Sequence, residues 1–320
     1  MPRVLKVLSQ DFPYRLRLRP VFCACSALAL ASCAPSGTGD GQSAFESALS
    51  KVSQNVAPIL KEISPELGGL VERLDTSPEK QIQMAAAGAK EVEQEHPRVK
   101  DPKLETYLTQ MARKLAHGQG TQHWDYEVAV IEDDQLNAFT VGAGQIYVTT
   151  GLVAALDDEA QMAMVLGHEI GHITEGHVVS ALRDKTMIAL AGAAGEGMIG
   201  GSAAGGPGDR EWLMLIGRIA ITAGINGYGR QQEEDADKIG LGYMVEAGYD
   251  PQQAPTVFEV FLERYGDQPA LVNFLHGDHP TSELRIQMLK RMVAANYAAQ
   301  EGAGTVNTPT YKKLVTKYKG

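Results

Sequence analysis

The chain has 320 residues, of which 44% are hydrophobic and 21% charged, a composition typical of a folded protein rather than a disordered one. The formal net charge is −10, and residues 1–32 hold five Lys or Arg and one Asp, so the rest of the chain carries −14. A body this acidic repels phosphate backbones, which argues against sequence-independent nucleic-acid binding.

The first 32 residues predict a signal peptide for export. A basic stretch at residues 15–19 precedes an apolar run at residues 21–30 that is too short to span a bilayer. The sequence Leu-Ala-Ser-Cys ending at Cys33 resembles the lipobox of bacterial lipoproteins; an ordinary signal peptide with a chance cysteine is the alternative. We therefore expect a lipid on Cys33 to anchor the chain. Because Ala34 replaces the aspartate that marks inner-membrane retention, we expect the outer membrane, facing the periplasm.

Four segments follow the signal peptide. Residues 33–43 are small and polar and predict a flexible tether, and residues 44–77 predict a helical segment interrupted by prolines. Residues 78–299 have the pattern of one α+β domain, mostly helical, with a small sheet. Residues 300–320 predict a polar, solvated tail with four lysines, for which contact with anionic lipid is the alternative.

Within the α+β domain, apolar spacing predicts helices, then strands, then helices again. We expect helices near 78–95 and 102–117, strands at 126–131, 137–139 and 145–149, a long helix from Asp157 or Asp158 to about Leu182, and helices at 211–224, 229–247, 252–265 and 281–299. Residues 190–209 are almost all Ala, Gly and Ser and predict a mobile loop rather than a membrane span.

The strongest chemical signal is the stretch GHEIGH at residues 167–172. Residues four apart on a helix share a face, so His168 and His172 can direct imidazole nitrogens at one metal ion. Glu169 lies beside them and can act as a general base without being a ligand. A helix with two surface histidines is the alternative, but the flanking apolar residues indicate a buried helix, where unpaired imidazoles are costly.

A catalytic zinc needs a third protein ligand and an open fourth position. On a continuous helix His177 would lie about 140° around the axis from His172, so it cannot share the metal, and we interpret it as a residue that packs near the site or supports a ligand side chain. Glu233 and Asp237, four apart on a later helix, are better placed. Glu233 would complete a His₂Glu set, while Asp237 would accept a hydrogen bond from the far nitrogen of a ligand histidine. A solvated acidic face is the alternative.

GHEIGH and the later E-x-x-A-D-x-x-G stretch from Glu233 to Gly240 together resemble the gluzincin metallopeptidases, the family of CAAX prenyl protease 1, HtpX, and mitochondrial OMA-type and BepA-type periplasmic proteases. The resemblance covers roughly residues 78–298, and the layout is similar to stand-alone lipoprotein members. It implies a zincin-like fold with a small sheet beside the HExxH helix, and one Zn²⁺ per chain. It also implies that Asn137 and Ala138 belong to an edge strand that binds extended substrate backbone.

The function implied by this resemblance is zinc-dependent endopeptidase activity in the bacterial envelope, directed at misfolded or unassembled periplasmic and outer-membrane proteins. A lipoprotein chaperone or assembly factor that holds clients in the same groove without cleavage is the alternative. Candidates for the transition-state donor are His279, Tyr249 and Arg285. In BepA-like relatives the histidine matching His279 can occupy the water position at zinc. We therefore expect His279 to be an inhibitory fourth ligand, a donor, or a structural histidine at a helix start.

Overall fold

The computed structural model describes residues 77–117, 124–181, 228–265 and 282–319, all of which belong to one compact unit of the chain. Several expectations lie outside the described residues: the signal peptide with Cys33, the tether, nearly all of the N-terminal helical segment, the loop at 190–209, the helix at 211–224 and His279.

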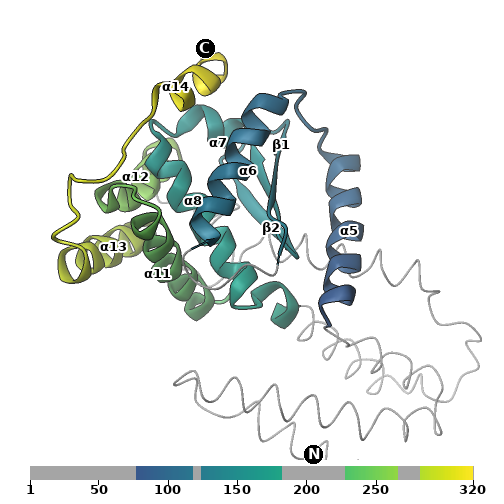
Figure 1. The fold of residues 1–320 in the computed structure, drawn as a ribbon, viewed down its shortest axis with the longest axis horizontal. Helices are drawn as coiled ribbons and strands as arrows, with labels where there is room; N and C mark the ends of the chain where they lie inside the picture. Colours follow the sequence, from purple (N-terminus) through teal and green to yellow (C-terminus); the bar gives the residue numbers. More distant parts are fainter. Residues whose placement is uncertain (1–76, 118–123, 182–227, 266–281, 320) are drawn as a thin grey trace, which may run out of the picture. The chain divides into compact units, whose positions relative to one another are not determined.

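Helices dominate the described part of the chain, and the predicted α+β class is confirmed (Figure 1). The elements are α5 (Pro78–Glu95), α6 (Pro102–Ala116), β1 (Glu127–Ile131), β2 (Ala138–Gly142), β3 (Gln145–Thr149), α7 (Thr150–Ala155), α8 (Glu159–Thr174), α11 (Arg230–Glu246), η2 (Pro251–Gln253), α12 (Ala254–Tyr265), α13 (Ser282–Asn296), α14 (Pro309–Val315) and η5 (Thr316–Tyr318).

The three described strands form a mixed sheet in the order β1-β3-β2. β1 runs parallel to β3, with Val128 opposite Ile146, and β2 runs antiparallel to β3, with Ala138 opposite Val148. β2 is therefore an edge of this sheet among the described residues, and it packs against α8.

Helices cover both faces of the sheet, as the side chains of β1 illustrate. Because side chains alternate along a strand, Val128 and Val130 enter the main core with α6 and α8, whereas Ala129 and Ile131 face α5. α5 lies on one side of the strands and α6 and α8 on the other (Figure 1). The sheet thus fixes α8, which carries the HExxH motif, against a packed interior.

α8 begins where the sequence predicts and ends earlier. Asp158 caps it, accepting a hydrogen bond from the backbone N–H of Gln161, whose side chain bonds back in a capping box. The helix was expected to continue to about Leu182, but it ends at Thr174. Gly176 has a φ of +67°, the left-handed conformation that commonly terminates helices, and a separate helical turn follows at residues 177–181.

The C-terminal residues differ from the solvated tail that we expected. Residues 300–319 fold against the domain: Thr305 forms a β-bridge with Tyr249, and Val306 accepts a hydrogen bond from the backbone N–H of Ala160. The side chain of Tyr311 is fully buried in the main core. This segment is part of the fold because its apolar side chains share one helix face.

Within the described ranges, the structure contains no helix long and apolar enough for a membrane crossing.

Candidate metal centre

Two helices supply the candidate ligands, and they meet at a contact between glycines. Gly167 on α8 and Gly240 on α11 lie so close that an added Cβ at Gly240 would stand 2.7 Å from the backbone nitrogen of His168. A side chain at either position would therefore force the helices apart. This approach brings Glu233, two turns before Gly240, to the histidines of α8.

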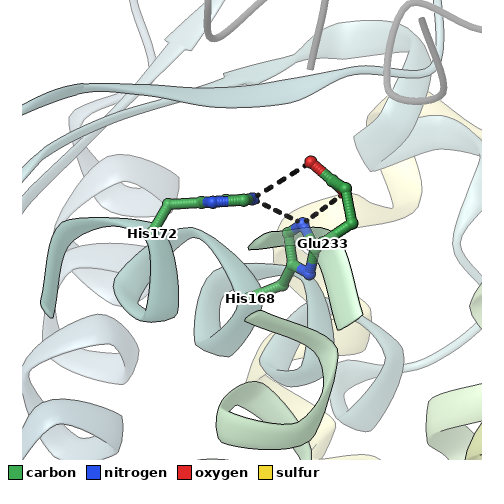
Figure 2. Close-up of side chains that lie close together, drawn as sticks. All are labelled: His168, His172 and Glu233. Atoms are coloured by element: carbon green, nitrogen blue, oxygen red, sulfur yellow. Dashed lines mark hydrogen bonds and ion pairs between the residues drawn. The ribbon is translucent and has the colours of Figure 1, made fainter. Parts of the chain in front are cut away.

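Figure 2 shows the two imidazoles and the Glu233 carboxylate turned toward one another. The Nε2 atoms of His168 and His172 are 3.0 Å apart, and Glu233 carboxylate oxygens lie 3.4 Å and 3.5 Å from these two nitrogens. All three side chains are buried, with at most 2% of each residue exposed. Burial of three polar groups without a common partner would be unfavourable, so a shared cation is the simplest way to satisfy them.

The donor set fits zinc. Zinc in proteins is bound tetrahedrally at about 2.0–2.2 Å by histidine nitrogen and carboxylate oxygen, which places neighbouring ligand atoms about 3.3 Å apart. The three measured separations between ligand atoms, 3.0–3.5 Å, bracket that value. Among the described residues, the group that brings potential metal-ligand atoms within 4.8 Å of one another is His168, His172 and Glu233.

A buried carboxylate and guanidinium support His168 from behind. Asp237 Oδ1 lies 2.9 Å from Nδ1 of His168, and Arg285 on α13 donates from Nε to Asp237 Oδ2 at 2.8 Å and from a second nitrogen to Oδ1. Burial raises the pKa of Asp237, but Arg285 and His168 outweigh it and hold that pKa below its usual value. Asp237 is thus an ionised acceptor that fixes the ring of His168.

Glu169 stands beside the ligands with its carboxyl group fully buried, and burial raises its pKa to about 8. A backbone hydrogen bond from Thr140 on β2 opposes this shift and ties the carboxyl group to the edge strand. A carboxyl group whose pKa lies near neutrality can both accept and return a proton. Glu169 is therefore suited to general acid–base work next to the metal ligands.

The sequence did not identify Tyr228, which lies against the site. Its ring packs on the ring of His172 with centroids 4.1 Å apart, and its backbone N–H donates to Oε1 of Glu233 at 3.1 Å. The Tyr228 hydroxyl is buried and has no hydrogen-bond partner in the described part of the chain. Its position five residues before Glu233, at the start of α11, is the one signal available in the sequence.

The structure shows the positions of two of the candidate transition-state donors, Tyr249 and Arg285. The Tyr249 hydroxyl donates to Glu159 at 3.0 Å, and Glu159 lies nine residues before His168 on α8, about 13 Å along the axis. Arg285 is fully buried, with its guanidinium 4.1 Å from the ring centre of Phe258, one nitrogen 3.4 Å from Oε2 of Glu233 and another 3.4 Å from Nδ1 of His168. The Tyr249 hydroxyl thus bonds at the start of α8, whereas Arg285 supports the ligand residues from within the core.

Asn137 and Ala138, the two residues predicted to belong to the substrate-binding strand, differ in the direction of their backbone groups. The backbone of Asn137 bonds inward: its carbonyl accepts from the N–H of Thr149 at 3.0 Å, and its N–H donates to Oγ1 of Thr149 at 3.1 Å. Because inward and outward backbone groups alternate in an antiparallel pair, the backbone of Ala138 points to the free edge. The backbone of Asn137 therefore bonds within the sheet, whereas we expected it to be available to substrate. Its buried side-chain Oδ1 has no hydrogen-bond partner among the described residues.

Comparison with known proteins agrees with this geometry. The model of peptidase family M48 matches residues 102–293. Beta-barrel assembly-enhancing protease of Escherichia coli is 28% identical over 64% of this chain and 42% of its own length. Mitochondrial metalloendopeptidase OMA1 of Arabidopsis thaliana is 30% identical over 66% and 41%, and metalloprotease LoiP of Escherichia coli is 26% identical over 59% and 70%. The matched region thus spans less than half the length of the first two relatives.

Proposed function

The chain belongs to peptidase family M48, and from this membership we propose that it is a zinc-dependent endopeptidase of the bacterial cell envelope. Its substrates are misfolded or unassembled periplasmic and outer-membrane proteins. The observation that carries the proposal is the convergence of His168, His172 and Glu233 with Glu169 buried beside them. The family implies zinc for these ligands.

The bound ion would supply a Lewis acid that polarises the scissile carbonyl. Glu169 would take the proton of the attacking water and deliver it to the departing amine, so the peptide bond is hydrolysed without an acyl-enzyme. Asp237 and Arg285 keep His168 oriented throughout, because their buried ion pair lies behind the ring.

Substrate would bind as an added strand on β2. The outward backbone groups of Ala138 support this mode, which recognises extended chain rather than one particular side chain. Recognition through backbone groups suits a protease that removes unfolded proteins of many sequences.

The test is cleavage of unfolded casein by the zinc-loaded protein and by Glu169→Gln, with zinc content measured in both. We expect Glu169→Gln to retain zinc and to lose activity by about 10²–10⁴-fold, the contribution typical of a general base. A wild-type protein that binds zinc and unfolded casein but cleaves none would instead support the chaperone alternative. Full activity in the variant would contradict the role of Glu169.

Attachment to the envelope follows from the same proposal. A lipid on Cys33 would hold the chain at the outer membrane, facing the periplasm. Cys33→Ser should release a soluble periplasmic protein with unchanged casein cleavage. If that variant stays with the outer membrane after a high-salt wash, the lipid is not the anchor.

His279 is proposed as the regulator of the site or as its transition-state donor. His279→Ala should raise basal proteolysis if the side chain is an inhibitory fourth ligand, and should lower it by about 10²–10³-fold if it is a donor. Unchanged turnover and zinc affinity would assign it the structural role.

A further inference from the structure

The second ligand histidine contacts another histidine. Nδ1 of His172 lies 2.8 Å from Nδ1 of His177, a hydrogen-bond distance, and 3% or less of each residue is exposed. The early end of α8 makes this contact: Gly176, at a φ of +67°, turns the chain so that His177 faces back toward His172. On a continuous helix the two rings would point in different directions.

One proton lies between these two nitrogens, and the site determines which ring carries it. Nε2 of His172 is the atom turned toward His168 and Glu233, so as a metal ligand it must present a lone pair. A neutral imidazole has a single N–H, which then sits on Nδ1 of His172. His177 must accept this hydrogen bond on its own Nδ1 and carry its proton on Nε2.

Packing holds the pair in this arrangement. The ring of Tyr228 lies 4.1 Å from the ring centre of His172 and 5.8 Å from that of His177. Tyr228 and Val178 are both buried and pack together in a small apolar cluster with Ala181. The ring of Tyr228 thus packs beside both imidazoles and limits how far either ring can turn.

We infer that His177 is a positioning residue of the metal site, which fixes the tautomer and the ring plane of ligand His172 by accepting its Nδ1–H. The two ligand histidines are then supported differently. Asp237, a carboxylate, accepts from His168, whereas a neutral imidazole accepts from His172. Because charge-assisted hydrogen bonds are roughly twice as strong as neutral ones, His172 is the less strongly polarised ligand of the two.

The inference rests on the proposed metal site, and its test is zinc affinity, which needs no substrate. Zinc would be titrated into the metal-free protein against a chromophoric chelator for wild type, His177→Leu and His177→Asn. Leu cannot accept a hydrogen bond, and we expect zinc affinity to fall by about 10–100-fold. Asn places Oδ1 where Nδ1 of histidine stood, so its affinity should stay within about threefold of wild type.

Two further measurements separate positioning from folding. The visible absorption of the Co²⁺-substituted protein should change in His177→Leu and match wild type in His177→Asn, because it reports ligand geometry. His96→Leu removes a part-exposed histidine from the end of α5 and should match wild type in affinity and spectrum. If His177→Leu does not fold, as judged by circular dichroism, His177→Phe serves as the non-accepting variant.

Wild-type affinity in a folded His177→Leu or His177→Phe variant would overturn the inference. So would a folded His177→Asn variant that is as weak as Leu, because the acceptor atom would then be irrelevant. A wild-type protein that binds zinc and cleaves no protein would contradict the proposed function and leave the role of His177 intact. A wild-type protein that binds no zinc would overturn both.

Discussion

Replacing Gly240 with alanine tests whether the close approach of α8 and α11 positions the metal ligands. The added Cβ would meet the backbone nitrogen of His168 at 2.7 Å and the carbonyl carbon of Gly167 at 2.9 Å, whereas ordinary contact begins at 3.4 Å. These are backbone atoms that no rotamer change can move. The helices must therefore separate locally by about 0.7 Å, a strain that typically costs about 1–3 kcal/mol.

The same substitution has a small opposing effect, because alanine favours a helix over glycine by about 1 kcal/mol. We expect a net loss of up to about 2 kcal/mol, which lowers the melting temperature of a domain this size by up to about 8 °C. Zinc affinity should fall at least about tenfold, since metal–ligand distances tolerate only about 0.2 Å and Glu233 moves with α11. Calorimetry of the metal-free protein and chelator competition measure the two effects.

Gly242→Ala is the matched control on the same helix. There the added Cβ would meet only the Tyr297 hydroxyl, at 3.7 Å, so the substitution should stabilise the metal-free protein by about 0.5–1 kcal/mol and leave zinc affinity unchanged. If Gly240→Ala behaves in the same way as Gly242→Ala, the glycine contact does not set the ligand positions, and the reasoning is refuted.

Substitutions at three further residues test the surroundings of the site and the packing of the C-terminal segment. Arg285→Leu leaves Asp237 buried without its cation and should cost about 3–5 kcal/mol in urea unfolding; a loss below about 1 kcal/mol would contradict the buried pair. Tyr228→Phe should barely change stability, because the hydroxyl has no described partner, whereas Tyr228→Ala should cost about 3–5 kcal/mol; equal losses would refute the packing of this ring on His172. Tyr311→Ala should cost a similar amount, and an unchanged melting temperature would show that the segment around it is not part of the fold.

The sequence predicts the described helices and strands well because their apolar residues recur with clear periods. The ligand set is also visible in the sequence: His168 and His172 share a helix face, and so do Glu233 and Asp237. The end of α8 was predicted incorrectly, because one glycine at a positive φ stops a helix whose apolar pattern continues beyond it.

The remaining features that the sequence analysis missed depend on tertiary contacts. No local pattern indicates that Tyr228 stacks on His172, since more than fifty positions in sequence separate the two residues. The C-terminal helix does carry a signal: Thr308 caps it, and Tyr311, Leu314 and Val315 share a face. The four nearby lysines favoured the prediction of a solvated tail instead. In the structure two of them, Lys317 and Lys319, bond back to the domain.

The contacts of Glu159 have a consequence for the order in which the protein is made. This buried carboxylate opens α8, yet it accepts hydrogen bonds from the N–H of Thr308 at 2.9 Å and from the Tyr107 hydroxyl at 2.8 Å. At synthesis rates of about 5–20 residues per second, α6 and α8 exist for seconds before Thr308 is added. During that interval the side chain of Glu159 lacks its hydrogen bond from Thr308. Because a buried carboxylate without its donors is costly, we expect the start of α8 to reach its native stability only after residues 305–318 are made.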